Sequence, residues 1–176
     1  GTKEGCAEGD CGACTVLLGE AAEGERGGAR VAWRAVNACV LFAPMLDGKA
    51  LMTVESLSRD DELAPVQRAM VDAHGSQCGF CTPGFVMSLH GRAIGALGTQ
   101  GRSVADVLSG NLCRCTGYGQ ILAAGEAVPP GPRDDAATAE ALAGLARAES
   151  GPGWFAPRDA DALAALLLAH PDARIV

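Results

Sequence analysis

The chain has 176 residues, enough for one ordinary domain or two small ones, because a core of fewer than about 80 residues is marginal without a disulfide or metal. Its 14 Lys and Arg against 21 Asp and Glu give a net charge of −7, and no basic stripe with interleaved aromatic residues is present, which argues against a nucleic-acid partner. No run approaches the roughly 18 to 20 apolar residues of a membrane span and no signal peptide opens the chain, so we expect a cytoplasmic protein without a membrane partner.

The first predicted feature is a glycine-rich loop with closely spaced cysteines. Its spacing, C-x4-C-x2-C followed by a distant fourth cysteine, is typical of a plant-type 2Fe-2S site. Gly5, Gly9 and Gly12 flank the cysteines, and glycine permits the positive φ and close approach that a cluster-binding loop requires. The alternative is a set of buried cysteines in a flexible loop. The pattern favours a first 2Fe-2S cluster held by Cys6, Cys11, Cys14 and Cys39.

Three strands are predicted next to this loop. Residues 15–18 and 30–36 are apolar or alternate in polarity, and a glycine-rich turn at 24–28 joins them. A third strand is expected at 49–54, after the turn signal Asp47-Gly48. Together with the cysteine loop they predict a small domain at residues 1–58.

Four short helices are predicted for residues 59–128, which form the second expected domain. Gly75 is the expected stop of the first helix. Thr82 as N-cap with Pro83 at the next position opens the second, and Ser103 opens the third. Short helices with polar connections indicate a compact bundle. The four helices are expected at 63–71, 82–94, 103–108 and 118–128.

The second cysteine set has the spacing C-x2-C…C-x-C. A four-cysteine zinc site also begins with C-x2-C, so a zinc-binding interaction module remains an alternative. Zinc ribbons usually close with a second C-x2-C, and here Thr82-Pro83 and Thr116-Gly117 would each start a helix whose positive end favours an anionic centre. A reducing compartment keeps thiols free for metal ligation. The pattern favours a second 2Fe-2S cluster held by Cys78, Cys81, Cys113 and Cys115.

The remainder of the chain is predicted to be a linker and the edge of another domain. Residues 129–132 read Pro-Pro-Gly-Pro, which sustains neither a helix nor a sheet, and residues 136–147 are Ala-rich and weakly helical. We therefore expect a linker at 129–153. Residues 159–170 predict a further helix, within a segment at 154–176 that belongs to another domain.

Three cysteine-rich segments stand out: GTKEGC…GDCGACTV from Gly1, QCGFCTPG from Gln77 and GNLCRCTGY from Gly110. They resemble the iron-sulfur region of the molybdenum hydroxylases, the xanthine dehydrogenase and aldehyde oxidase family. The resemblance implies an α+β fold in which a plant-ferredoxin-like β-grasp domain and an all-α four-helix domain each hold a 2Fe-2S cluster. It also implies electron transfer from a molybdopterin centre through both clusters to FAD and NAD.

The resemblance also assigns residues and partners. The first cysteine set matches the flavin-side ligands and the second the molybdenum-side ligands, and Gln77 matches a glutamine that contacts the pterin. The implied partners are a molybdopterin-binding large subunit and an FAD domain. No catalytic residue is expected in this chain, which would turn over no substrate alone.

Residues 154–176 are similar to the opening of the FAD domain in bacterial xanthine dehydrogenase small subunits. Family members carry strands before the Gly1 segment, so the resemblance implies a truncated β-grasp domain, in a fragment of a longer chain. The alternatives are an aldehyde oxidoreductase or carbon monoxide dehydrogenase-type small subunit, and a free-standing ferredoxin.

Overall fold

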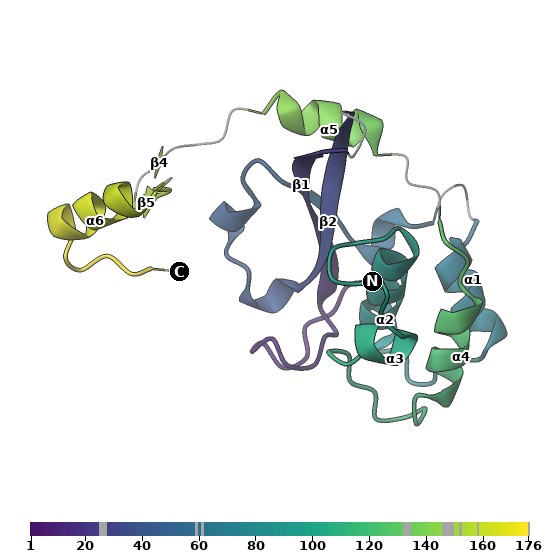
Figure 1. The fold of residues 1–176 in the computed structure, drawn as a ribbon. Coiled ribbons are helices and arrows are strands. Elements are labelled where there is room, and N and C mark those ends of the chain that lie inside the picture. Colours follow the sequence, from purple (N-terminus) through teal and green to yellow (C-terminus); the bar gives the residue numbers. More distant parts are fainter. Residues whose placement is uncertain are drawn as a thin grey trace. The chain divides into compact units, whose positions relative to one another are not determined.

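The computed structural model describes residues 1–24, 28–58, 60, 62–131, 135–145, 150–151, 153–157 and 159–175. The chain forms two compact units, Gly1–Gly144 and Leu145–Val176. In the first unit a small antiparallel sheet is followed by several helices, an α+β arrangement (Figure 1). The boundaries predicted at residues 58, 128 and 153 stay predictions.

The sheet contains the three strands that the sequence predicts. They are β1 (Thr15–Glu23), β2 (Ala29–Asn37) and β3 (Ala50–Met52), in the order β2-β1-β3 with antiparallel pairing throughout. β1 is longer than expected and β3 shorter. The expected turn between β1 and β2 falls partly on residues 25–27, which lie outside the described residues.

The helices predicted after the sheet are present. They are α1 (Pro65–Asp72), α2 (Thr82–Ala93), α3 (Val104–Val107) and α4 (Gly119–Ala127). Ser103 caps α3 as predicted, because its Oγ accepts a hydrogen bond from the Asp106 amide at 3.1 Å. Contacts join α1 with α2 and α4, and α3 with α2 and α4.

Two helix ends differ from the prediction by one residue. The N-cap of α2 is Cys81 rather than Thr82, and the Thr82 hydroxyl instead pairs with Ser76 Oγ at 2.8 Å. At the end of α1 the residue with a left-handed backbone is His74, with φ of 53°, and not Gly75. The amide of Gly75 then donates to the Met70 carbonyl at 2.8 Å, which closes the helix with a Schellman-type bond.

Helix α2 lies between two hydrophobic cores and is buried on both sides. Phe85 and Leu89 belong to the core of the helices, whereas Met87 packs with Leu17 and Trp33 against the sheet. A helix that is apolar around most of its circumference is stable only in such an environment. α2 therefore joins the helices to the sheet.

Within the predicted linker, helix α5 (Ala136–Ala143) packs on β1 and β2, and its Leu142 is buried. In the second unit, β4 (Ser150–Gly151) pairs with β5 (Trp154–Phe155), and α6 (Ala160–Ala169) follows. Asp159 caps α6 through a bond from the Ala162 amide at 2.8 Å. The helix predicted at 159–170 is thus confirmed.

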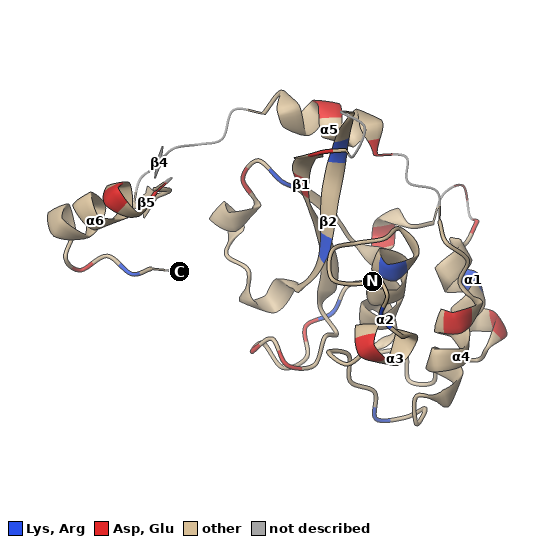
Figure 2. Cartoon of the chain, in the orientation of Figure 1, with Lys and Arg blue, Asp and Glu red and all other residues tan. Residues whose placement is uncertain are grey.

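The charges of the described residues are scattered over the elements, with acidic and basic side chains interspersed (Figure 2). Glu20 and Lys49 form an ion pair at 2.7 Å between β1 and the residue before β3. Among the helices described, none is long and apolar enough to cross a bilayer.

Candidate metal centres

The first cysteine set lies on the loop before β1 and in the turn after β2. The Cys6 thiol interacts with the Cys11 thiol, and the Cys39 thiol interacts with the Cys14 thiol as a second pair. Cys6 also acts electrostatically on Cys39, so the two pairs face each other. The structure therefore brings the four members of this set together as two pairs.

Backbone amides surround the thiols of this first set. The amides of Asp10 and Cys11 each donate to Cys6 Sγ at 3.4 Å, and the Cys39 amide donates to Cys14 Sγ at 3.4 Å. A loop that turns so many amides inward needs left-handed residues, and Gly9 and Gly12 have φ of 78° and 68°. The loop is thus built to stabilise negative charge on sulfur.

The second set lies where helices begin. Cys81 is the N-cap of α2 and Cys113 is buried in the helical core, and their thiols interact with each other. Cys78 and Cys115 form the other pair, and both are exposed. Cys78 and Cys113 also interact electrostatically. This set therefore consists of an inner pair in the core and an outer pair at the surface.

Side chains rather than backbone amides alone support the inner pair. Thr116 Oγ1 lies 3.2 Å from Cys113 Sγ and accepts the Tyr118 amide at 3.1 Å. The Tyr118 hydroxyl accepts the Cys113 amide at 2.9 Å, and the Tyr118 ring packs edge-on against Phe85 at 6.1 Å. Tyr118 itself has a left-handed backbone with φ of 68°. The Cys113 loop is thus fixed to the start of α4 and to the core.

The thiol pKa values show charge concentrated on one member of a pair. Hydrogen bonds from backbone amides, that of Glu8 first, lower the pKa of Cys6 to about 7. Burial raises the pKa of Cys113, but bonds from Thr116 outweigh it and lower the pKa to about 7. Burial, followed by the contact with Cys113, raises the pKa of Cys81 to about 12.

The outer pair behaves in the same way. The amide of Phe80, followed by the Cys115 thiol, lowers the pKa of Cys78, and the bond to Cys78 raises the pKa of Cys115. Within each pair of the second set one thiolate thus holds the proton on its neighbour. A cationic centre between them would let both ionise, which is what metal ligation requires.

The thiols of each set can be compared with the ligands of an iron-sulfur cluster. A four-cysteine 2Fe-2S cluster needs four thiolates, and each set supplies two interacting pairs, with amides or hydroxyls beside the sulfurs. The residues present therefore fit such a cluster.

A direct hydrogen bond joins the two cysteine sites. The Leu112 amide, next to Cys113, donates to the carbonyl of Cys11 at 2.9 Å. The side chain of Asn111 also reaches the first loop, where Nδ2 donates to the Gly12 carbonyl at 3.0 Å. The two sites, about 100 residues apart in sequence, meet along their backbones.

Sequence reasoning missed Asn111, Thr116 and Tyr118 as site residues, although all three lie in the GNLCRCTGY segment. Asn111 precedes Cys113, and Thr116 and Tyr118 lie between Cys115 and α4, so closeness to the cysteines was the available signal. Gln77, predicted to contact a pterin, is exposed beside Cys78. Its role stays a prediction, as does ligation by the eight cysteines.

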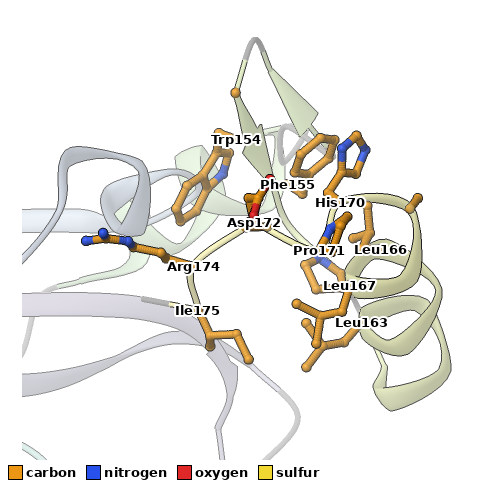
Figure 3. Close-up of a pocket in the computed structure, with 14 residues that line it drawn as sticks. Trp154, Phe155, Leu163, Leu166, Leu167, His170, Pro171, Asp172, Arg174 and Ile175 are labelled. Atoms are coloured by element: carbon orange, nitrogen blue, oxygen red, sulfur yellow. The ribbon is translucent and has the colours of Figure 1, made fainter.

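The second unit contains an apolar hollow of about 760 Å³ and no cysteine (Figure 3). Leu163, Leu166 and Leu167 of α6 form one wall, and Trp154 lies across from them. Phe155 stacks on His170 at 4.6 Å. The thiol chemistry of the chain thus belongs to the first unit.

Comparison with known proteins identifies relatives of this arrangement. A [2Fe-2S] binding domain family matches residues 53–126. Xanthine dehydrogenase from Drosophila subobscura is 48% identical over 123 residues, which are 69% of this chain and 9% of that protein. The chain thus spans about a tenth of the length of such curated relatives.

Two solved structures share both fold and sequence. Quinoline 2-oxidoreductase from Pseudomonas putida 86 is 34% identical, with a TM-score of 0.58 over 83% of this chain and 78% of that chain. Aldehyde oxidoreductase from Desulfovibrio gigas is also 34% identical, with a TM-score of 0.58 over 72% of this chain and 13% of that chain. The small sheet followed by helices is therefore a shared architecture.

Proposed function

Because this chain belongs to the molybdenum hydroxylase family, as its 2Fe-2S region, we propose that it transfers electrons between a molybdopterin centre and a flavin. The observation that carries the proposal is the meeting of two thiol quartets along one hydrogen-bonded backbone contact. A 2Fe-2S cluster, when bound, takes up and releases single electrons. The chain's own residues hold the sulfurs, donate hydrogen bonds to them and fix the distance between the sites.

We assign the ligands by contact. The two halves of the first site are Cys6 with Cys11 and Cys14 with Cys39. The two halves of the second site are Cys78 with Cys115 and Cys81 with Cys113. The amides at Cys6 and Cys14 and the hydroxyl of Thr116 stabilise negative sulfur, so they favour the reduced state.

The exposure of the second site supports its assignment to the molybdenum side. Cys78 and Cys115 are exposed, and the exposed Gln77 is adjacent to them. Phe80 and Leu112, 46% and 40% exposed, add apolar surface nearby. A molybdopterin-binding large subunit that covers this face would bring its pterin to Gln77 and to the outer thiol pair.

The finer identity rests on the family. We propose a xanthine dehydrogenase-like protein, with an aldehyde oxidoreductase or carbon monoxide dehydrogenase-type small subunit as the alternative. The sheet would be part of a β-grasp domain, the four helices a cluster-binding bundle, and residues 154–176 the start of an FAD domain after the linker. Thiols remain free for ligation in the reducing cytoplasm, which is the compartment we propose.

Low-temperature EPR of the dithionite-reduced intact protein tests the proposal. Two distinct 2Fe-2S signals, with four iron and four sulfide per chain by chemical analysis, are expected for two clusters of two irons each. A colourless, diamagnetic zinc protein would refute it. Co-purification with flavin and molybdopterin separates the proposed role from that of a free-standing ferredoxin.

A further inference from the structure

A buried polar cluster joins the two cysteine sites. It consists of Thr15 at the start of β1, Ser88 in the middle of α2 and Asn111 two residues before Cys113. These three are the buried polar side chains in the part of the chain that the structure describes, and Asn111 is only 4% exposed. Water cannot replace a lost partner at such a position, so each polar atom there depends on its neighbours in the protein.

The Asn111 amide is paired on both sides. Nδ2 donates to the Gly12 carbonyl at 3.0 Å and to Thr15 Oγ1 at 3.2 Å, while Oδ1 accepts from Ser88 Oγ at 2.7 Å. The main chain of Asn111 is fixed as well, since its amide donates to the Leu108 carbonyl at 2.9 Å. Asn111 thus connects the second cysteine loop with the first loop, β1 and α2.

Glycines allow the backbones to touch at this point. A Cβ at Gly12 would clash with the Gly110 carbonyl and the Asn111 side chain, and a Cβ at Gly84 would clash with the Gly12 carbonyl. Backbone atoms yield less readily than the ends of flexible side chains. The separation of the two cysteine loops is therefore set by rigid contacts around Asn111.

We propose that Asn111 is a positioning residue that clamps the first cysteine loop onto the second and thereby sets the electronic coupling between the two clusters. The clamp holds the Cys11 carbonyl on the Leu112 amide, so that one hydrogen bond and one residue separate Cys11 from Cys113. The coupling part of this inference rests on the proposed function, whereas the clamp itself rests on the contacts of this chain.

The substitution Asn111→Asp in the intact protein tests the clamp. It keeps the acceptor for Ser88 but replaces the donor to Gly12 with an oxygen that repels the carbonyl. We expect loss of amide-exchange protection in peptides that contain Leu112. In the reduced protein we expect loss of the EPR line splitting that arises from magnetic interaction between the two clusters, while both individual signals persist.

Asn37→Ala is the matched control. The Asn37 side chain donates to the Gly9 carbonyl at 2.5 Å, so it is also an asparagine bonded to the first cysteine loop, and among the described residues no side-chain hydrogen bond joins it to the second. We expect it to leave both Leu112 protection and the splitting as in the unmodified protein. An equal loss in Asn37→Ala would overturn a specific role for Asn111.

A second variant covers the case in which Asn111→Asp does not fold or load. Ser88→Ala removes only the partner of Oδ1, and the clamp predicts a partial loss of Leu112 protection and of the splitting. Unchanged protection in the variant that folds overturns the clamp, and two cluster signals without splitting in the unmodified protein overturn the coupling. Absence of both clusters refutes the proposed function, but the exchange measurement still decides whether Asn111 joins the loops.

Discussion

The two cysteine sites stabilise sulfur by different means. In the first, an irregular loop turns backbone amides toward Cys6 and Cys14, and the local sequence supplies the glycines that this needs. In the second, the inner thiols depend on burial beside α2 and on the side chains of Thr116 and Tyr118. Changes elsewhere in the fold should therefore affect the first site little, whereas changes in the helical core should disrupt the second site.

The contact between the sites is where a single change should affect both. Gly84→Ala places a methyl group against the Gly12 carbonyl, and because the obstacle is backbone, we expect a loss of stability of about 1–3 kcal/mol or more. Thermal unfolding followed by circular dichroism should show a lower Tm, and iron analysis should show depletion of both sites.

Gly119→Ala is the control for that substitution. Gly119 begins α4, and a Cβ there meets no atom within 4 Å. Replacing glycine at such a helical position leaves Tm unchanged or raises it. If the two variants unfold at the same temperature, α2 is not in rigid contact with the first cysteine loop.

Removal of one thiol from each site sharpens the comparison. Cys113→Ser and Cys6→Ser should each remove one cluster, that is, half of the iron and sulfide. Cys113 also packs in the helical core, so a hydroxyl there should cost about a further 1–3 kcal/mol in folding stability. Cys6 lies outside both cores, and its variant should keep the Tm of the helices. Equal losses of Tm in the two variants would mean that the second site depends on the helical core no more than the first does.

Tyr118→Phe isolates one hydrogen bond of the second site. The ring contact with Phe85 remains, but the Cys113 amide loses its acceptor, at a cost of about 1 kcal/mol. We expect a shift in the EPR signal and reduction potential of the second cluster. The first cluster is the internal control, and a shift of both signals would show that Tyr118 acts through the fold as a whole.

The sequence predicts the local features of this molecule better than the distant ones. The three strands and the Ser103 cap depend on neighbouring residues, and the sequence predicts them. The pairing of the thiols and the contact of Gly12 with Gly84 and Asn111 depend on tertiary packing, which spacing does not encode. Asn111 in particular looks like an ordinary loop asparagine until the fold buries it between two loops.

The smallest expected effect concerns the anchor of the first loop. Glu55 accepts bonds from the amide and hydroxyl of Thr2 at 2.7 and 2.9 Å. Bonds from Thr53 and then Thr2 lower the pKa of Glu55 from 4.5 to about 2, so the ionised form favours the anchored loop. The anchor should be fully present above about pH 4.5 and lost as the pH falls toward 2.

Glu55 is exposed, so the free-energy change is small, and amide exchange in residues 1–5 is the suitable measurement. Glu55→Gln should show the faster exchange already at pH 7, and identical exchange in both proteins would mean that the first loop holds its thiols without this anchor.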